Sequence, residues 1–134
     1  MIKKTKVEIE HELRSKSQNI IWKLISTPEG MGKWLADKIT QAGNKLTFTW
    51  GHDGKDRETK NAIVTEKVKN KTVRFHWEGE EHDDDGYVEL RIEKNAVTND
   101  YALHITDFAQ ADDVDWLYNI WNGNIQRLHL SSGA

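Results

Sequence analysis

The sequence predicts an α+β protein in which a curved antiparallel sheet of six to seven strands wraps around a long C-terminal helix, with two short helices after the first strand. Three observations lead to this prediction. Several segments alternate apolar and polar residues with a period of two, which is typical of strands with one wet face. Turn-forming residues join these segments by short connections, which favours antiparallel pairing. The last segment has the period of a helix.

The first strand is predicted near the N-terminus, where less polar residues alternate with lysines and glutamates. The inward set is Thr5, Val7, Ile9, His11 and Leu13. A serine, Ser15 or Ser17, can then cap a short helix. The apolar face of this helix is predicted to consist of Ile20, Ile21, Leu24 and Ile25, with Trp22 on its flank.

A second short helix is predicted directly after the first. Thr27 and Pro28 form a good N-cap and first-turn pair, because proline has the helical φ and its missing N–H would be unpaired at that position. Three apolar residues then share one face: Met31, Trp34 and Leu35. From residue 37 onward the pattern predicts only strands, until the C-terminal helix begins.

The strands after residue 37 are predicted from alternating apolar positions. Turns between them are expected at Asp53–Gly54, Asn70–Lys71 and Asn99–Asp100. The apolar positions are Leu46, Phe48 and Trp50, then Ala62, Val64 and Val68, then Val73, Phe75 and Trp77, then Val88, Leu90 and Ile92, and finally Tyr101, Leu103 and Ile105.

A C-terminal helix of about 16 to 18 residues is predicted to begin after Asp112 and Asp113, which supply a cap and negative charge. Its inward stripe is Val114, Leu117, Trp121, Ile125 and Leu128. Trp116 and Ile120 lie off this stripe, which predicts a helix gripped over a broad face. Gly123, in the middle, predicts either a close neighbour or a bend.

Composition bounds the protein class more than the function. The 134 residues suit one domain, 1–134, and the single proline and scattered serines mark no linker. The absence of cysteine excludes disulfides, thiolate metal sites and cysteine nucleophiles. The net charge of −3 is mixed along the chain, so no nucleic-acid partner is indicated. Without a long apolar run, neither a membrane span nor an export signal is predicted, and a cytoplasmic location is expected.

Residues 17–35 resemble the N-terminal signature of START-like domains, the SRPBCC or helix-grip superfamily. The matching features are an aromatic residue on the first helix, a Thr-Pro-Glu sequence, and a tryptophan followed by a large apolar residue: Trp22, Thr27–Glu29 and Trp34–Leu35. Residues 46–51, 75–77 and 116–128 continue the match over essentially the whole chain. The sequence is most similar to small START-like proteins of Bacteroidetes-type bacteria and to activators of a heat-shock chaperone ATPase.

The resemblance implies a cavity between the C-terminal helix and the concave face of the sheet. In relatives, this cavity holds apolar or amphipathic small molecules, so we expect non-catalytic binding of such a ligand. The alternative is a protein-interaction module of the chaperone-activator type with a filled core. The resemblance implies no cofactor, and homodimerisation is left open.

The residues expected to line the cavity alternate inward on the strands or lie on the inner side of the helices. They are Trp34, Phe48, Trp50, Val64, Phe75, Trp77, Leu90, Leu103, Trp121 and Ile125. Aromatic side chains of this size can either close a core or line a pocket, and both interpretations stay open. Polar candidates for orienting a ligand are His11, Tyr101 and Asn124.

No catalytic or metal site is predicted. His76 and His104 are one register off the apolar positions, so they are expected to face solvent, and His11 is expected in the core or on the cavity wall. The acidic segment 80–86 lacks the full spacing and flanking helices of a calcium loop and is interpreted as a solvated turn. Nucleophile-elbow, phosphate-loop and zinc-protease motifs are absent, so an enzyme is not expected.

Overall fold

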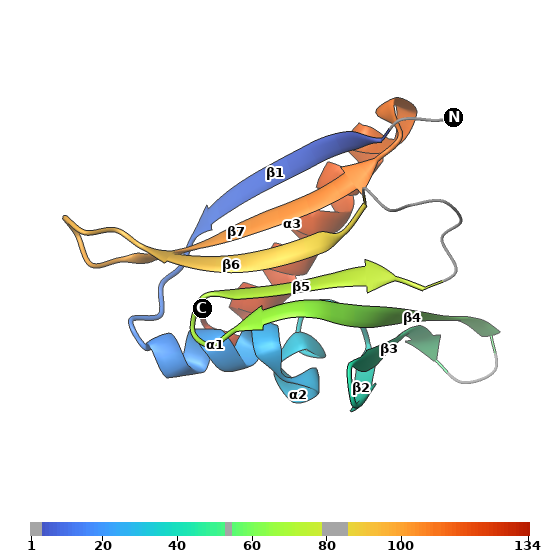
Figure 1. The fold of residues 1–134 in the computed structure, drawn as a ribbon, viewed down its shortest axis with the longest axis horizontal. Helices are drawn as coiled ribbons and strands as arrows, with labels where there is room; N and C mark the ends of the chain where they lie inside the picture. The colour runs from blue at the N-terminus through green and yellow to red at the C-terminus, as the bar shows by residue number, and fades with distance from the viewer. Residues whose placement is uncertain (1–3, 53–54, 79–85) are drawn as a thin grey trace.

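A computed structural model describes residues 4–52, 55–78 and 86–134, without the side chains of residues 52, 55 and 56. In chain order the elements are β1 (Thr5–Glu12), α1 (Gln18–Ser26), α2 (Pro28–Met31), β2 (Lys38–Ala42), β3 (Lys45–His52), β4 (Lys55–Val68), β5 (Thr72–Trp77), β6 (Val88–Lys94), β7 (Tyr101–Ala109), a 3-10 turn (Ala111–Asp113) and α3 (Val114–Ser132). This confirms the predicted α+β class (Figure 1).

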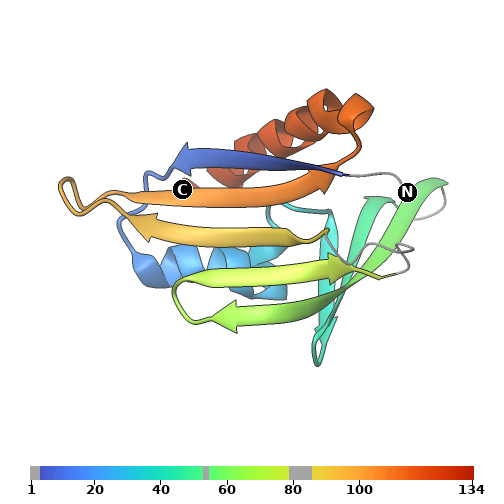
Figure 2. The same cartoon turned by 45° about the horizontal axis from the view of Figure 1, so that its top comes forward.

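The strands form one antiparallel sheet with the order β1-β7-β6-β5-β4-β3-β2. The first strand in the chain pairs with the last one, so β1 closes one edge beside β7. The sheet is curved, and α3 runs across the face on which α1 also lies (Figures 1 and 2). This is the predicted arrangement of a sheet wrapped around its C-terminal helix.

The two short helices begin where the capping residues predict. The Ser17 hydroxyl accepts a hydrogen bond from the Ile20 amide, and the Thr27 hydroxyl accepts one from the Gly30 amide at 3.0 Å. Gly30 is required by packing, because a Cβ there would lie 1.9 Å from the Lys23 carbonyl oxygen of α1. The turn between the helices therefore depends on a residue without a side chain.

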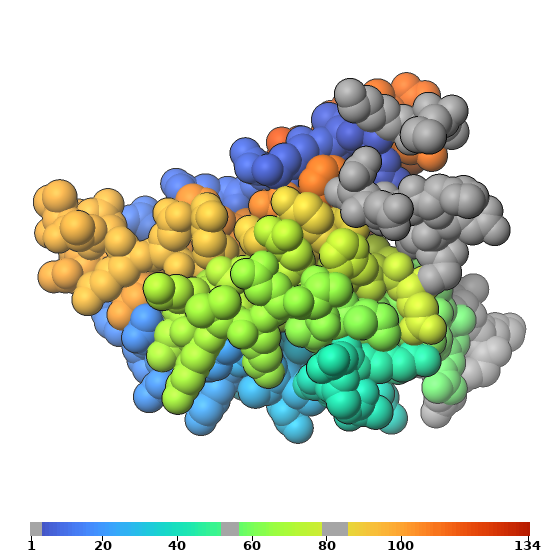
Figure 3. Space-filling view, viewed as in Figure 1, coloured from blue at the N-terminus to red at the C-terminus, as the bar shows by residue number. Residues whose placement is uncertain are grey.

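The core lies between the concave face of the sheet and the three helices. The largest side chains that are almost fully buried are Trp34, Phe48, Phe75, Ile21, Ile25 and Met31. The inward stripe of α3 contributes Leu117, Trp121, Ile125 and Leu128. Figure 3 shows the opposite face of the sheet, where side chains of β4 to β6 cover the surface and the β6–β7 hairpin projects at one end.

Three expectations for individual strands and helices are corrected. Ile20 is 53% exposed, because Ile21, Leu24 and Ile25 take the buried face of α1. Val68 is exposed, because a bulge between Val64 and Glu66 reverses the inward register of β4. Strand β2 was not predicted, since only one of its five residues, Ile39, is buried. The predicted turn at Asp53–Gly54 lies outside the described residues.

Helix α3 differs from its prediction in three respects. It has 19 residues, and the 3-10 turn precedes it, so Asp113 occupies the N-cap position without a side-chain hydrogen bond. The helix is not gripped over a broad face, because Trp116 and Ile120 are exposed. No described atom would lie within 4 Å of a Cβ at Gly123, so this glycine does not mark a close neighbour within the chain.

Candidate functional site

The ten residues expected to line a cavity belong to the core or pack against it. Seven are buried: Trp34, Phe48, Phe75, Leu90, Leu103, Trp121 and Ile125. Three are partly buried: Trp50, Val64 and Trp77. The structure thus brings this set together in or against one core between the helices and the sheet. Their role as the wall of a ligand cavity stays a prediction.

The aromatic members of this set hold one another closely. Phe48 lies 4.9 Å from Trp77, 5.5 Å from Phe75 and 5.7 Å from Trp50, measured between ring centroids. Trp34 lies 6.1 Å from Trp121. Such distances are those of packed aromatic pairs. Much of the space between sheet and helix is therefore occupied by protein side chains.

Three of the four tryptophans of this set, Trp34, Trp50 and Trp121, donate their indole N–H groups in hydrogen bonds. Trp34 Nε1 donates to the Leu24 carbonyl at 2.8 Å, and Trp50 Nε1 donates to the Leu35 carbonyl at 3.0 Å. Trp121 Nε1 donates to a carboxylate oxygen of Asp107 at 2.9 Å. A buried indole needs such a partner, so these tryptophans are fixed in position as well as packed.

A histidine pair joins the edge of the sheet to the end of the long helix. His11 is on the inward register of β1, opposite Leu103, and His129 is in the last turn of α3. The two Nε2 atoms are 2.7 Å apart, and the ring centroids are 4.7 Å apart. At this distance one Nε2 carries a hydrogen and the other accepts it. When both rings are neutral, one proton therefore lies between the two Nε2 atoms, and the accepting ring carries its own proton on Nδ1.

A pocket of about 350 Å³ opens beside this pair, between β1 and α3. It is lined by His11, Glu12, Leu13, Arg14, Asp100 and His129. The backbone holds the pocket in place: the Leu13 amide donates to the Tyr101 carbonyl at 2.8 Å, and the Arg14 amide donates to the Ala134 carbonyl at 3.2 Å. Asp100 forms an ion pair with Lys16.

The surroundings of His11 oppose its protonation. Burial lowers the pKa of His11 below 6.5, and the nearby His129 and Arg14 lower it further, against a smaller opposing effect of Glu12. The Nδ1 atom of His129 is buried and has no hydrogen-bond partner within the described part of the chain. Because Nδ1 can donate or accept, depending on the tautomer of the ring, the pair has one unused hydrogen-bonding position at His129.

The other polar candidates lie elsewhere. Tyr101 is buried and lines a second pocket of about 280 Å³ with His104, Glu10 and Glu93 among its walls. Asn124 is half-buried on α3 and lines neither pocket. His104 Nε2 is 3.0 Å from a carboxylate oxygen of Glu10 and of Glu93. Of the three predicted polar residues, His11 is the one that lines the pocket beside His129 of α3.

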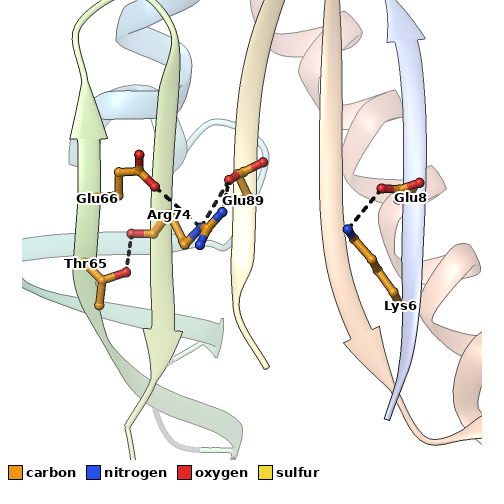
Figure 4. Close-up of polar contacts among 6 residues, drawn as sticks. All are labelled: Lys6, Glu8, Thr65, Glu66, Arg74 and Glu89. Carbon is orange, nitrogen blue, oxygen red and sulfur yellow. Dashed lines mark hydrogen bonds and ion pairs between the residues drawn. The ribbon is translucent and has the colours of Figure 1, made fainter. Parts of the chain in front are cut away.

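Polar contacts also cover the outer face of the sheet. Arg74 Nη2 lies 2.6 Å from a Glu89 carboxylate oxygen, and Arg74 Nε lies 3.7 Å from one of Glu66 (Figure 4). The hydrogen bond to Glu89 raises the pKa of Arg74. These pairs join neighbouring strands. In residues 4–52, 55–78 and 86–134, no three histidine or carboxylate side chains are placed to hold a metal ion.

His129 was not among the residues predicted for the site. Its position one residue after the buried Leu128 places it on the flank of the inward stripe, and that signal was available. The sequence does not show which part of β1 the last turn of α3 lies against, and this placement decides that His129 meets His11. The acidic segment 80–86 falls almost entirely outside the described residues, so its expected turn is not assessed.

The fold and the pocket define an α+β helix-grip scaffold with a hollow between its last helix and its first strand. The sequence model of the START-like superfamily domain matches residues 1–134, and the chain belongs to this superfamily. START-like domains are in general binding or interaction scaffolds rather than catalysts. None of the helices that the structure describes is long and apolar enough to cross a membrane.

Solved structures agree with this assignment. BfR322 from Bacteroides fragilis is 36% identical over 96% of this chain and 90% of its own, with a TM-score of 0.64. The Aha1 dimer from Colwellia psychrerythraea is 18% identical over 96% of this chain and 98% of its own, with a TM-score of 0.72. MLL2253 from Mesorhizobium loti is 14% identical over 94% of this chain and 95% of its own, with a TM-score of 0.70. A search of curated proteins found no match.

Proposed function

We propose that the protein binds a small amphipathic molecule without transforming it, and that the pocket between β1 and α3 holds the polar end of this ligand. The observation that carries the proposal is the pairing of His11 with His129 in a hollow of about 350 Å³. Hollows of this size are within the range of small-molecule sites. The proposal includes a cytoplasmic location and requires no cofactor.

The polar end that suits the pocket best is an acidic group. Arg14 supplies a permanent positive charge, and either histidine of the pair can donate a hydrogen bond to a carboxylate. An anion beside His11 would offset the burial and the neighbouring cations that hold its pKa down. Ligand binding would therefore be accompanied by proton uptake.

The two carboxylates that line the pocket, Glu12 and Asp100, both repel an anion, but to different extents. Asp100 is paired with Lys16, so part of its charge is already balanced. Glu12 lines the same pocket and favours the protonated form of His11. Calorimetric titration should show tighter binding of an acid by Glu12→Gln than by wild type, because the direct repulsion between Glu12 and the ligand outweighs the small effect of Glu12 on His11.

The apolar end of the ligand would contact Leu13, the lining residue that also belongs to the core. Burial of such a chain gains about 25 cal/mol per Å² of apolar surface. Deeper insertion, toward the predicted lining residues around Trp34 and Trp121, requires α3 to move away from the sheet, because those side chains now pack against each other. We propose that α3 opens in this way on binding.

Calorimetric titration with decanoate and decanol tests the proposal, since these ligands share a chain and differ in the acidic group. We expect saturable binding of decanoate, weaker binding of decanol, and at least about a tenfold loss for His129→Gln. His76→Gln, a half-buried histidine on β5 outside the pocket, is the matched control and should bind normally. Absence of saturable binding by fatty acids, alcohols and aromatic acids would contradict the proposal.

The second candidate is a protein-interaction module of the chaperone-activator type. The packed aromatic interior supports it, because a filled core leaves the outer surface as the place of function. Structural similarity to an Aha1 dimer is in keeping with it, although this similarity concerns the fold. Stoichiometric capture of a chaperone by the purified chain, together with failure of every small ligand, would favour this candidate.

A further inference from the structure

A second apolar stripe runs along α3, on the side turned away from the sheet. Trp116 is 61% exposed, Ile120 is 43% exposed and Leu130 is 88% exposed. At about 100° per residue, Leu130 points opposite to the centre of the buried stripe of Leu117, Trp121 and Ile125, whereas Trp116 lies about 140° and Ile120 about 100° from that centre. A helix with apolar residues on a second side leaves that side uncovered when it packs on a single sheet.

Gly123 and Arg127 lie on the same side of α3 as these apolar residues, and Arg127 donates a hydrogen bond to the Ala36 carbonyl at 2.9 Å. Gly123 lies seven residues after Trp116 and seven before Leu130. Nothing in the described structure approaches a Cβ at this position within 4 Å, so the glycine leaves the helix surface bare. A bare backbone between two apolar ends lets another helix approach closely at its middle.

We propose that this stripe, made of Trp116, Ile120, Gly123 and Leu130, binds the same stripe of a second copy of the chain in a two-fold, antiparallel helix pair. With Gly123 near the two-fold axis, Trp116 would lie against the partner's Leu130, and each contact would occur twice. Such self-complementarity is what an isologous interface requires. The pocket beside His11 lies on another side of α3, so this interface is independent of the proposed ligand site.

The charges at the two ends of α3 favour the antiparallel orientation. Asp112, Asp113 and Asp115 are exposed at its first end. Lys33 lies beside its last end, where the Ser131 hydroxyl donates to the Lys33 carbonyl at 3.2 Å. An antiparallel pair places the acidic end of one copy near the lysine of the other and opposes the two helix dipoles. A parallel pair would place acidic ends together.

The same charges argue against other occupants. A membrane surface is anionic on its cytoplasmic side and would repel the three aspartates near Trp116. The stripe by itself is small, so the pair would be at the low end of stable interfaces, and we expect a dissociation constant in the micromolar range. The dimer should therefore dissociate on dilution.

Sedimentation velocity over a range of protein concentrations tests the proposal. The wild-type chain should shift from monomer to dimer, and Ile120→Asp should remain monomeric at least about tenfold above the wild-type midpoint. Val97→Asp is the matched control, because Val97 is 90% exposed in the β6–β7 hairpin, away from the stripe, and should dimerise normally. Circular dichroism checks that both variants fold. A wild-type monomer at all concentrations overturns the proposal.

Cross-linking tests the orientation, since the chain has no cysteine of its own. In a mixture of the Trp116→Cys and Leu130→Cys proteins, the disulfide between the two different variants should form faster than the disulfide between two copies of either one. Mass spectrometry distinguishes these products. Preferential self-cross-linking of each variant would mean a parallel pair and would overturn the antiparallel model. Val97→Cys gives the background rate of random collisions. Binding of decanoate by Ile120→Asp should be unchanged, which separates this proposal from the proposed function.

Discussion

The histidine pair shows how far single residues could be understood from sequence. The alternation of residues 5–13 placed His11 on the inward face of its strand, and the structure confirms a half-buried side chain there. Its partner could not be predicted, because the contact joins residues separated by 118 positions and depends on where α3 ends against β1. Local pattern gives the facing of a residue, whereas a site needs the placement of whole elements.

Acidification should destabilise the protein through His11. Its pKa in the folded state is below the ordinary 6.5, so from about pH 6.5 downward the unfolded chain binds a proton that the folded chain does not. The contribution of His11 to stability is complete above the unfolded pKa and is lost as pH falls toward the folded one. Urea unfolding at several values between about pH 7.5 and 5.5 should show a free energy of unfolding that falls as the pH is lowered.

The variant His11→Gln should flatten that slope, because glutamine does not titrate. His76→Gln is the control and should retain the wild-type pH dependence, since His76 is on β5 and does not line the pocket. An equal slope in wild type and His11→Gln would show that the pair does not carry the effect.

At the scale of elements, boundaries with a chemical signal were predictable and those without were not. The caps at Ser17 and Thr27 and the turns with positive φ at Asn70 and Asn99 are confirmed. Strand β2 escaped prediction, because a short edge strand with a mostly polar sequence has no apolar alternation. The bulge in β4 was also invisible, since the extra residue at Thr65 has no distinguishing side chain.

Two glycines should respond in opposite ways to alanine. At Gly30 the new Cβ would collide with the backbone of α1, so we expect Gly30→Ala to lower the free energy of unfolding by about 2 kcal/mol or more. At Gly123 the space is open, and glycine inside a helix is less favourable than alanine. Gly123→Ala should therefore raise the free energy of unfolding by about 0.5 to 1 kcal/mol.

Chemical denaturation at low protein concentration measures both glycine variants against wild type, which keeps any dimer from contributing. Stabilisation by Gly30→Ala would contradict the packing described for the turn between α1 and α2. Destabilisation by Gly123→Ala would contradict the open surface at Gly123, where the sequence predicted a close neighbour or a bend.

At the scale of the whole molecule, the fold was predictable because its signals repeat along the chain. Seven antiparallel strands and an amphipathic final helix leave few ways to bury one face of the sheet. How the interior divides between packed side chains and open space was not predictable, since it depends on side-chain positions such as the contact between Trp34 and Trp121. A pattern of aromatic residues is the same for a core and for a pocket wall.

The central claim is that the pocket between β1 and α3 receives an acidic group beside the paired imidazoles. NMR titration of the His11 and His129 ring signals tests it most directly, with and without saturating decanoate. Because proton and ligand binding are reciprocally linked, the account predicts that decanoate raises the pKa of His11, which the protein alone holds below 6.5. An identical titration of His11 in the presence of bound decanoate would contradict it.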